Sequence, residues 1–258
     1  MILSIITINK NNAAGLEKTL RSIVLQKFRE YEIIIIDGAS SDSSLEVISK
    51  YLENIAYWVS ESDLGIYNAM NKGIKKATGK YCFFLNSGDY LVDNDVLNKV
   101  FGKAPTEDIL FGNLIVTIND KNADMVYGKE TLNFSDIYSN IVKHQASFIK
   151  KELFDSYGFY NERRKIIADW EFFLKTLGFG NVSYRYVNVF ISYFDNDGLS
   201  NRNAELVKEE RKQVIEENIP ARMQPDFEFL YNYRNYLGLF RSKVAFFFIR
   251  VFRKIILK

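Results

Sequence analysis

The amino-acid sequence predicts an α/β protein with a mostly parallel sheet flanked by helices. Short apolar runs alternate with segments of helical periodicity in the first part of the chain, an order that implies right-handed crossovers between parallel strands. The chain has 258 residues, of which 47% are hydrophobic, enough to bury a substantial core in one or two domains. A formal net charge of only +2 gives no reason to expect a nucleic-acid partner.

The first two predicted strands are apolar runs separated by an amphipathic helix. Residues 2–8 indicate a strand, and Asn12 is placed to cap the helix that follows. That helix carries one apolar stripe, formed by Leu16, Leu20, Ile23 and Val24. Residues 31–36 are typical of a strand buried on both faces.

The alternation continues after the second strand. Ser43 and Glu46 have the spacing of a capping box, which predicts a helix over residues 44–52. The next expected elements are a strand over 56–60, a helix over 67–77 that stops at Gly79, and a strand over 81–85.

Polar side chains follow three of these strands. They are Thr7 and Asn9 after the first strand, residues 37–42 after the second and residues 86–89 after the fourth. In an open parallel sheet, ligands bind beyond the carboxyl ends of the strands, where loops can carry polar groups. We therefore expect the three groups to converge on one edge of the sheet.

The second half of the chain is less regular. Residues 109–118 suggest a hairpin or paired strands around Gly112 and Asn113. Further elements are expected as a strand over 147–149, a helix over 169–177, a strand over 182–193 and a helix over 202–217. No proline-rich linker divides the core, so we predict one domain over residues 1–220 and a helical tail over 221–258.

The end of this tail is basic and amphipathic. Residues 240–258, FRSKVAFFFIRVFRKIILK, contain six basic residues and no acidic one, with apolar residues at helical spacing. This pattern is typical of helices that lie on anionic membranes, and a helix packed on its own domain is the alternative. Because Cys82 is the single cysteine and the start lacks the features of a secretory signal, we expect a cytoplasmic protein. The tail suggests peripheral contact with the cytoplasmic face of a membrane.

Two common nucleotide-binding motifs are absent. No G-x-G-x-x-G follows the first strand and no glycine loop ends in Gly-Lys-Ser/Thr, so neither a dehydrogenase nor a P-loop enzyme is supported. A sugar-phosphate nucleotidyltransferase is disfavoured because no glycine-rich, arginine-bearing loop follows the first strand. The strand ends carry carboxylates and amides, which suit a ribose, a base edge or a divalent cation.

Four segments occur in a recognisable order: SIITINKNNAAGLEKTLRSIVLQKFREYEIIIIDGASSDSS, ESDLGIYNAMNKGIKKATGKYCFFLNSGDYL, HQASFIKKELF and ADWEFFLK. They resemble the family 2 glycosyltransferases, with their Rossmann-like type A fold. DLGIYNAMNKGI and LNSGD are similar to bacterial members that build surface polysaccharides. The resemblance implies an inverting transfer from a nucleotide-diphosphate sugar, with UDP favoured, to a hydroxyl of a glycan or lipid-linked acceptor.

The resemblance also implies roles at the strand ends. Asp37 matches the family aspartate that hydrogen-bonds the base of the nucleotide, usually uracil, and Thr7 and Asn9 would line the same pocket. Three residues would lie against the ribose and the diphosphate: Asp63, Gly65 and Asn71.

Residues 86–89 match the metal-binding D-x-D-type motif of the family. Asp89 matches its last aspartate, where Mg²⁺ or Mn²⁺ bridges the two phosphates of the donor. Asn86, Ser87 and Gly88 would face the donor sugar and the diphosphate. Because Asn86 stands where many relatives have an aspartate, we expect weaker metal affinity.

On the acceptor side, Asp169 matches the aspartate that opens the helix after the acceptor site. An inverting transfer needs such a carboxylate to take a proton from the attacking hydroxyl. His144 matches a position in the HQ motif of the family. His144, Trp170 and Glu171 are expected near the acceptor or the diphosphate.

Each motif taken alone also has a structural interpretation. Asp37 and Ser43 can form a turn and a cap, residues 86–89 are ordinary turn chemistry, and Asp169 can cap a helix. A lone histidine is commonly structural. The joint order of the motifs favours an enzyme, and a non-catalytic nucleotide-sugar-binding or scaffold protein, motivated by Asn86, is the alternative.

Overall fold

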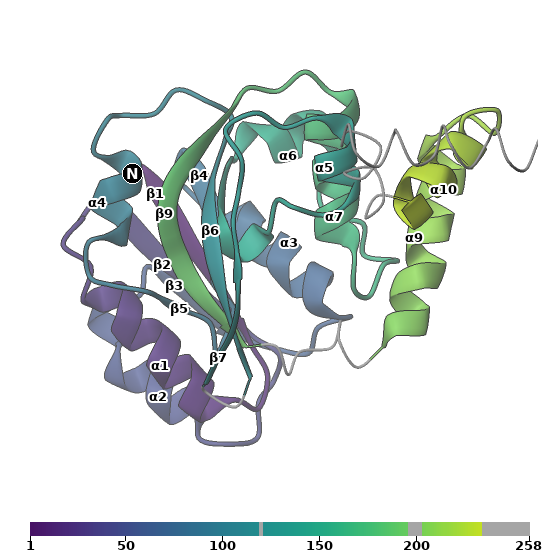
Figure 1. The fold of residues 1–258 in the computed structure, drawn as a ribbon. Coiled ribbons are helices and arrows are strands. Elements are labelled where there is room, and N and C mark those ends of the chain that lie inside the picture. The colour runs from purple at the N-terminus through teal and green to yellow at the C-terminus, as the bar shows by residue number, and fades with distance from the viewer. Residues whose placement is uncertain (119–120, 196–202, 234–258) are drawn as a thin grey trace, which may run out of the picture.

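The computed structural model describes residues 1–118, 121–195 and 203–233. Within these ranges nine strands form one sheet with helices on both faces (Figure 1). The strand order is β3-β2-β1-β4-β8-β6-β9-β5, and β7 pairs with β6. The α/β class predicted from the sequence is confirmed.

The first half of the chain builds a parallel block within the sheet. Its strands are β1 (Leu3–Asn9), β2 (Tyr31–Asp37), β3 (Tyr57–Ser60) and β4 (Tyr81–Phe84). The intervening helices are α1 (Ala13–Val24), α2 (Ser44–Lys50), the short η1 (Leu52–Asn54) and α3 (Ile66–Lys76). β1 lies between β2 and β4, and β3 extends the sheet beyond β2, with all pairs parallel as predicted.

The second half adds antiparallel pairs and more helices. The strands are β5 (Tyr90–Leu91), β6 (Ile109–Ile118), β7 (Lys121–Val126), β8 (Ser147–Lys150) and β9 (Tyr184–Asp195). The helices are α4 (Val96–Phe101), α5 (Phe134–Tyr138), η2 (His144–Ala146), α6 (Glu152–Tyr157), α7 (Ala168–Phe173), the π-helical η3 (Leu174–Phe179), α9 (Ala204–Asn218) and α10 (Gln224–Tyr233). β8 runs antiparallel to both β4 and β6, whereas β9 runs parallel to β6.

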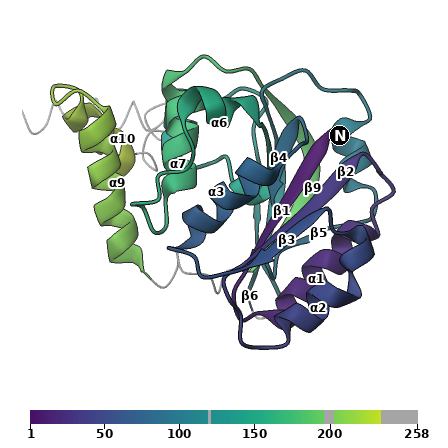
Figure 2. The ribbon, with the colours of Figure 1, turned by 180° about the vertical axis from the view of Figure 1, so that it is seen from behind.

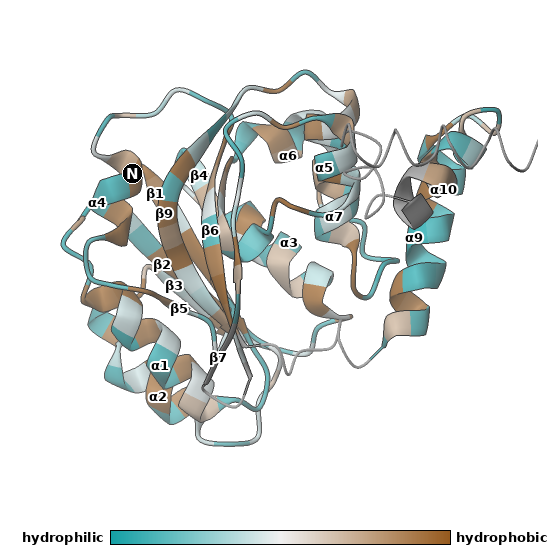
Figure 3. Ribbon diagram, viewed as in Figure 1, coloured by the Kyte–Doolittle hydropathy of each residue, from teal (hydrophilic) through white to brown (hydrophobic). Residues whose placement is uncertain are grey.

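The central strands are buried on both faces. Figures 1 and 2 show α1 and α2 on one face of the sheet and α3, α6 and α7 on the other. Phe83 of β4 packs into the hydrophobic cluster on the α1 side of the sheet, whereas its neighbours Cys82 and Phe84 pack into the cluster on the α3 side. Burial raises the pKa of the Cys82 thiol to about 12, so it is an unreactive core residue, as expected. Hydrophobic residues follow the strands in Figure 3, while α9 is mostly hydrophilic.

The prediction of a hairpin or paired strands around Gly112 and Asn113 is wrong, because residues 109–118 form one continuous strand. Both residues lie inside β6, where the pairing with β9 shifts register. A Cβ atom on Gly112 would lie 2.6 Å from the backbone oxygen of Val189, so only glycine allows the two strands to approach here. This glycine marks an irregularity within a strand.

The predicted capping box is also wrong. Ser43 makes no side-chain hydrogen bond to α2. Oδ1 of Asp42 accepts from the backbone N–H of Ser44 at 3.0 Å, and its Oδ2 accepts from the N–H of Ala13 at 2.9 Å. One carboxylate therefore holds the starts of both α1 and α2, while Asn12 caps α1 as predicted.

The first part of the predicted tail packs against the domain. Phe227 of α10 is 6% exposed, and its ring centroid lies 4.8 Å from that of Phe134 in α5. The basic segment 240–258 lies outside the described residues. Over the described ranges, we find no helix whose length and apolar character would let it cross a membrane.

Candidate active site

The carboxyl ends of β1, β2 and β4 meet at one edge of the sheet, as the sequence predicted. Asn9, the last residue of β1, pairs in register with Asp37, the last residue of β2. The turn after β4 is tied to the same place, because Nδ2 of Asn12 donates to the backbone oxygen of Ser87 at 3.1 Å. Three separate segments of sequence thus share one edge.

Asp37 lies inside this edge and is fully hydrogen-bonded. Its Oδ1 accepts from Nδ2 of Asn9 at 2.7 Å and from Oγ of Ser40 at 2.6 Å. Its Oδ2 accepts from the N–H of Ser40 at 2.9 Å and from Oγ of Ser60 at 2.6 Å. Burial raises the pKa of this carboxyl, but the hydrogen bonds from Ser40, Ser60 and Asn9 outweigh it, so the pKa lies below its ordinary value. With 0% exposure, Asp37 braces the ends of three strands in this structure, and its expected contact with the base of the nucleotide stays a prediction.

Thr7 and Asn9 are buried beside Asp37, and their expected place in the nucleotide pocket stays a prediction. Thr7 is 0% exposed, and its Oγ1 has no hydrogen-bond partner. Besides its bond to Asp37, Nδ2 of Asn9 donates to Oγ of Ser44 at 2.9 Å. Oδ1 of Asn9, like Oγ1 of Thr7, is buried without a hydrogen-bond partner.

Asp63 is the carboxylate that lies nearer the surface of this edge. It is half-buried, and its Oδ1 accepts from the N–H of Gly65 at 2.9 Å. A Cβ atom on Gly38 would lie 2.5 Å from its Oδ2, so this oxygen occupies the space that a side chain after β2 would fill. Gly65 has φ +126°, a conformation that favours glycine, and directly precedes α3.

Asn71 is hydrogen-bonded within the protein. Its Nδ2 donates to the backbone oxygen of Tyr160 at 2.9 Å and to Oε1 of Glu162 at 2.9 Å, and its Oδ1 accepts from the N–H of Tyr160 at 3.1 Å. These bonds tie α3 to the loop before α7. The expected place of Asn71 near the ribose and the diphosphate stays a prediction.

The turn after β4 holds the residues that resemble a metal motif. The N–H of Asp89 donates to the backbone oxygen of Asn86 at 2.9 Å, and Gly88 adopts φ +106°. Oδ1 of Asn86 is buried without a partner, and Asp89 is 4% exposed. An amide oxygen and a carboxylate in one turn fit Mg²⁺ or Mn²⁺, which also bind the phosphates of a substrate. The described residues contain no cluster of three or more His, Cys, Asp or Glu that could hold a metal.

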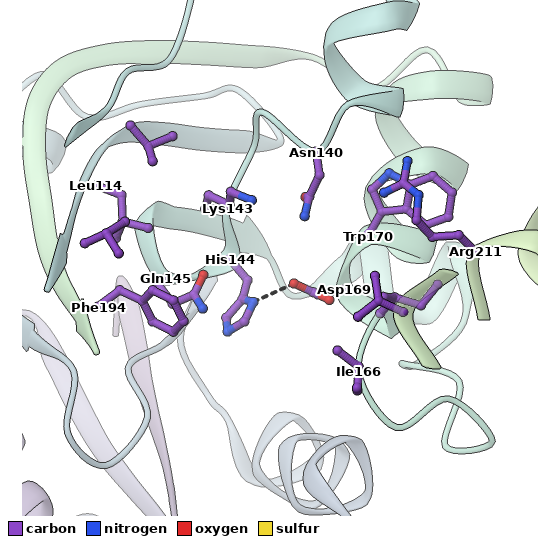
Figure 4. A pocket seen from close by; sticks show the side chains of 14 residues that line it. Leu114, Asn140, Lys143, His144, Gln145, Ile166, Asp169, Trp170, Phe194 and Arg211 are labelled. Carbon is purple, nitrogen blue, oxygen red and sulfur yellow. Dashed lines mark hydrogen bonds and ion pairs between the residues drawn. The ribbon is translucent and has the colours of Figure 1, made fainter. Parts of the chain in front are cut away.

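His144 and Asp169 form a direct pair on the other side of the site. Nδ1 of His144, in η2, lies 2.6 Å from Oδ2 of Asp169, in the first turn of α7 (Figure 4). The hydroxyl of Tyr67 lies 2.8 Å from Oδ1 of Asp169 and 2.6 Å from the backbone oxygen of Ile166, so its proton is shared between two acceptors. We did not single out Tyr67 in the sequence, although it lies two residues after Gly65 at the start of α3.

The pKa shifts of Asp169 and Tyr67 indicate which groups in this pair and beside it carry a proton. Burial raises the pKa of the Asp169 carboxyl, but the charge and hydrogen bond of His144 and the bond from Tyr67 outweigh it, and the pKa falls below its ordinary value. Burial raises the pKa of Tyr67 well above its ordinary value, helped by the charge of Asp169, so Tyr67 stays protonated. An ionised carboxylate can only accept, so Nδ1 of His144 carries the proton between them.

The pair lies in the wall of a pocket of about 340 Å³ (Figure 4). Apolar side chains, among them Leu114 and Phe194, line one part of it, and Lys143 and Arg211 line another. The guanidinium of Arg211, on α9, lies 3.9 Å from the ring centroid of Trp170. The pocket therefore combines an acid–base pair with apolar and cationic walls, a combination typical of a substrate site.

The side chains of Trp170 and Glu171, which are neighbours in α7, lie in different surroundings. Trp170 lines the pocket, and its Nε1 donates to the backbone oxygen of Ile137 at 3.2 Å. Glu171 points into the protein, where its Oε2 lies 3.2 Å from Nε of Arg164 and its Oε1 lies 2.6 Å from Nζ of Lys175. Its carboxylate holds the loop before α7, and its expected contact with acceptor or diphosphate stays a prediction.

Comparisons with known proteins agree with this geometry. The model of glycosyl transferase family 2 matches residues 4–167. A PGL/p-HBAD biosynthesis glycosyltransferase of Mycobacterium bovis is 31% identical over 205 residues, which are 77% of this chain and 78% of that protein. An uncharacterised glycosyltransferase of Mycobacterium tuberculosis is 35% identical over 181 residues, 67% of each chain.

Solved structures share the fold at low sequence identity. S. aureus TarS 1–349 in complex with UDP aligns with a TM-score of 0.67 and 18% identity, covering 94% of this chain and 76% of that one. Mannosyltransferase PcManGT from Pyrobaculum calidifontis, in complex with GDP-Man and Mn²⁺, aligns with a TM-score of 0.61 and 17% identity, covering 99% and 80%. The family match and the sequence relatives together show that the chain belongs to glycosyl transferase family 2 and is a glycosyltransferase.

Proposed function

We propose that the protein transfers a sugar from a UDP-linked donor to a hydroxyl of a glycan or lipid-linked acceptor in bacterial surface-polysaccharide synthesis, with inversion at the anomeric carbon. The observation that carries this proposal is the ionised Asp169, paired with His144 in the wall of the 340 Å³ pocket. Tyr67 connects this pair to the helix that starts beside the strand ends. A base on one side and a diphosphate site on the other suit a single displacement.

The strand-end edge is the donor side of this proposal. Asp63 contacts the nucleoside, because it is the half-buried carboxylate beside Gly38. Residues 86–89 face the diphosphate, and Asp89 with Asn86 would hold Mg²⁺ or Mn²⁺. Such an ion would neutralise charge on the departing nucleoside diphosphate. UDP as the nucleotide and Mn²⁺ as the metal are supported by the complexes named for TarS and PcManGT.

The pocket beside α7 is the acceptor side. A hydroxyl bound there loses its proton to the Asp169–His144 pair as its oxygen attacks the donor sugar. Tyr67 holds the Asp169 carboxylate at its second oxygen, which fixes the orientation of the pair. Trp170 and the guanidinium above it form a rigid wall for the acceptor.

The test is a panel of nucleotide sugars with wild type and Asp169→Asn. Thermal stabilisation with and without Mn²⁺ reports donor binding, and release of nucleoside diphosphate reports turnover. We expect the variant to bind donor as the wild type does and to lose about 10²–10⁴-fold in kcat, the usual contribution of acid–base catalysis. A wild type that binds UDP but turns over no donor in the panel would contradict the proposal and favour a binding protein.

A cytoplasmic enzyme with peripheral membrane contact through residues 240–258 completes the proposal. The support is the composition of that segment, with six basic residues, no acidic residue and apolar positions at helical spacing. Co-sedimentation with anionic liposomes should be lost on deletion of residues 240–258. Association that is unchanged by the deletion would overturn this part alone.

A further inference from the structure

We propose that the pocket beside α7 takes an acceptor that carries an oxyanion, a phosphate or a carboxylate, and that Arg211 and Lys143 recognise this group. The inference rests on the proposed glycosyl transfer and names the chemical class of its acceptor. Arg211 lies on α9, beyond residues 4–167 that match the family model. An element outside the matched region therefore builds part of this subsite.

The guanidinium of Arg211 is held in place by two aromatic rings. Its Cζ lies 3.9 Å from the ring centroid of Trp170 and 5.3 Å from that of Tyr138. Its Nη2 also donates to the backbone oxygen of Tyr138. Stacking fixes the plane of a guanidinium, whose N–H groups lie along its edge in a fork that matches the paired oxygens of a carboxylate or phosphate. Arg211 is thus oriented before a ligand arrives.

The helix that carries Arg211 is anchored to the loop before Asp169. Glu210, the preceding residue, is 4% exposed. Its two carboxylate oxygens accept from the backbone N–H groups of Lys165 at 2.6 Å and Ile166 at 3.1 Å. This loop leads directly into α7, whose first turn holds Asp169. The packing therefore fixes the position of Arg211 relative to the Asp169 carboxylate.

Lys143 brings a second cation to the same pocket. It directly precedes η2 and lines the pocket together with Arg211. The amide of Asn140, oriented so that its nitrogen donates to the backbone oxygen of Val142, accepts from Nζ of Lys143 at 3.2 Å. Among the described residues that line the pocket, Asp169 is the only one with a carboxylate. The described wall therefore carries two cations and one carboxylate, a charge balance that attracts anions into a cleft.

The order of groups along the pocket suits an acceptor with an anionic part and an apolar part. In Figure 4 Asp169 lies between Arg211 with Trp170 at one end and Leu114 with Phe194 at the other. A hydroxyl delivered to Asp169 then has a cationic wall on one side and an apolar wall on the other. The oxyanion takes no part in bond making, and its contacts place the reacting hydroxyl.

The diphosphate of the donor is the other anion that these cations could bind. In the proposed function the diphosphate lies against residues 86–89, and the nucleoside lies at the end of β2. Among the described residues, neither 37–42 nor 86–89 lines this pocket. The cations therefore belong to a different wall from the donor edge, which favours the acceptor as their ligand.

Binding to the UDP-loaded protein tests the inference without requiring turnover. Saturating UDP occupies the diphosphate site, and calorimetry then compares three probes below their micellar concentrations: octyl phosphate, octyl glucuronide and octyl glucoside. We expect the wild type to bind at least one anionic probe about tenfold or more tightly than octyl glucoside, as charge-assisted hydrogen bonds usually provide. Tighter binding of octyl phosphate assigns a phosphate, and tighter binding of octyl glucuronide assigns a uronic acid. Equal affinity for all three probes, or no binding of the anionic ones, overturns the inference.

Two variants locate the preference in the pocket. Arg211→Gln and Lys143→Gln should each lower the ratio of anionic to neutral affinity by about tenfold. Because the ratio compares two probes on one protein, a general loss of stability in a variant cancels, and Lys143→Gln decides if Arg211→Gln does not fold. Lys212→Gln is the matched control, since it removes the same charge from the next position of α9, where the side chain is 77% exposed. Its ratio should equal that of the wild type.

The outcomes separate the acceptor from the donor. An unchanged ratio in both pocket variants, or an equal fall in Lys212→Gln, overturns the inference. If the pocket variants weaken UDP binding and keep the ratio, the cations serve the donor diphosphate, and the inference fails while the proposed function stands. A wild type that turns over no donor in the nucleotide-sugar panel overturns the proposed function, and with it the assignment of the oxyanion to an acceptor.

Discussion

Two carboxylates in this molecule, Asp37 and Asp169, show how differently the two sides of the site are built. Asp37 receives four hydrogen bonds of 2.6 to 2.9 Å from its own neighbours and is sealed from solvent. Asp169 is held by two side chains, one of which is left with an unpartnered nitrogen. Asp37 thus has two hydrogen bonds at each oxygen and no exposure, whereas Asp169 has one side-chain partner at each oxygen and lies in the wall of a pocket.

The two sides also differ in how far apart their parts lie in sequence. The donor edge comes from consecutive strands and turns within the first 89 residues, packed through parallel pairing. The acceptor side joins Tyr67 on α3, His144 in η2, Asp169 on α7 and Arg211 on α9. Only tertiary packing brings these four residues together, so the geometry of the acceptor side depends on the stability of those contacts.

The largest effect on stability should come from the ion pair that supports α7. Glu171 and Arg164 have side chains that are 3% and 4% exposed. Replacing Glu171 by Ala leaves Arg164 with Gln213 and Glu217 as partners, so we expect a loss of about 3 kcal/mol, the low end for a broken buried pair. Denaturant unfolding measures this loss in the free energy of unfolding. Turnover should also fall, because the loop before Asp169 loosens.

Lys175→Ala is the matched control for this prediction. Lys175 pairs with the same carboxylate at 2.6 Å, but its side chain is 36% exposed. Its removal should cost under about 1 kcal/mol. Equal losses in the two variants would mean that burial does not distinguish these pairs.

A smaller loss, about 2 kcal/mol, is expected for Asp37→Ala. Its four donors lose their acceptor, and the serine hydroxyls recover part of the cost through other partners. The folded-state pKa of Asp37 is depressed, so its contribution is present above the unfolded value near 3.9 and is lost as pH falls below it. Urea unfolding should therefore show less acid sensitivity between pH 5 and 3 in the variant than in the wild type. A variant with unchanged stability and abolished donor binding would instead support the base contact that the sequence pattern indicated.

The parallel half of the fold could be predicted from the sequence because its signals are local. Apolar runs, the Asn12 cap and the turn residues after each strand all lie within a few positions of the structure that they specify. The hairpin at Gly112 was mispredicted because glycine permits both a turn and a close approach of strands, and only the neighbouring β9 decides between them. Local patterns fail where a distant segment determines the backbone.

The same limit applies to the site. The motifs placed Asp169 and His144 in one site, but the bond between them and the orphaned nitrogen depend on how η2 packs against α7. Glu171 follows the same motif, yet its helical position turns it toward Arg164 and away from the pocket. Residue type and order predict which segments meet, whereas the direction of each side chain requires the fold.

The smallest expected effect is a change in UDP affinity on the donor side of the site. In Gly38→Ala, the new Cβ would lie 2.5 Å from Oδ2 of Asp63 and force that carboxylate to move. Because Asp63 is half-buried at the surface, it can shift at little cost to stability, but its proposed contact with the nucleoside would weaken by about 1 kcal/mol, roughly fivefold in Kd. Calorimetric titration with UDP measures the change.

A double-mutant cycle with Asp63→Ala tests whether that carboxylate carries the effect. In the Asp63→Ala background the nearest side-chain atom to the added methyl group is Cδ of the flexible Lys10, at 3.3 Å, so Gly38→Ala should cost little further affinity. Additive losses would instead mean that the methyl group blocks the nucleotide directly, and that Gly38 itself forms part of the binding surface. Either outcome locates the nucleoside against the end of β2, but only the non-additive one assigns its recognition to Asp63.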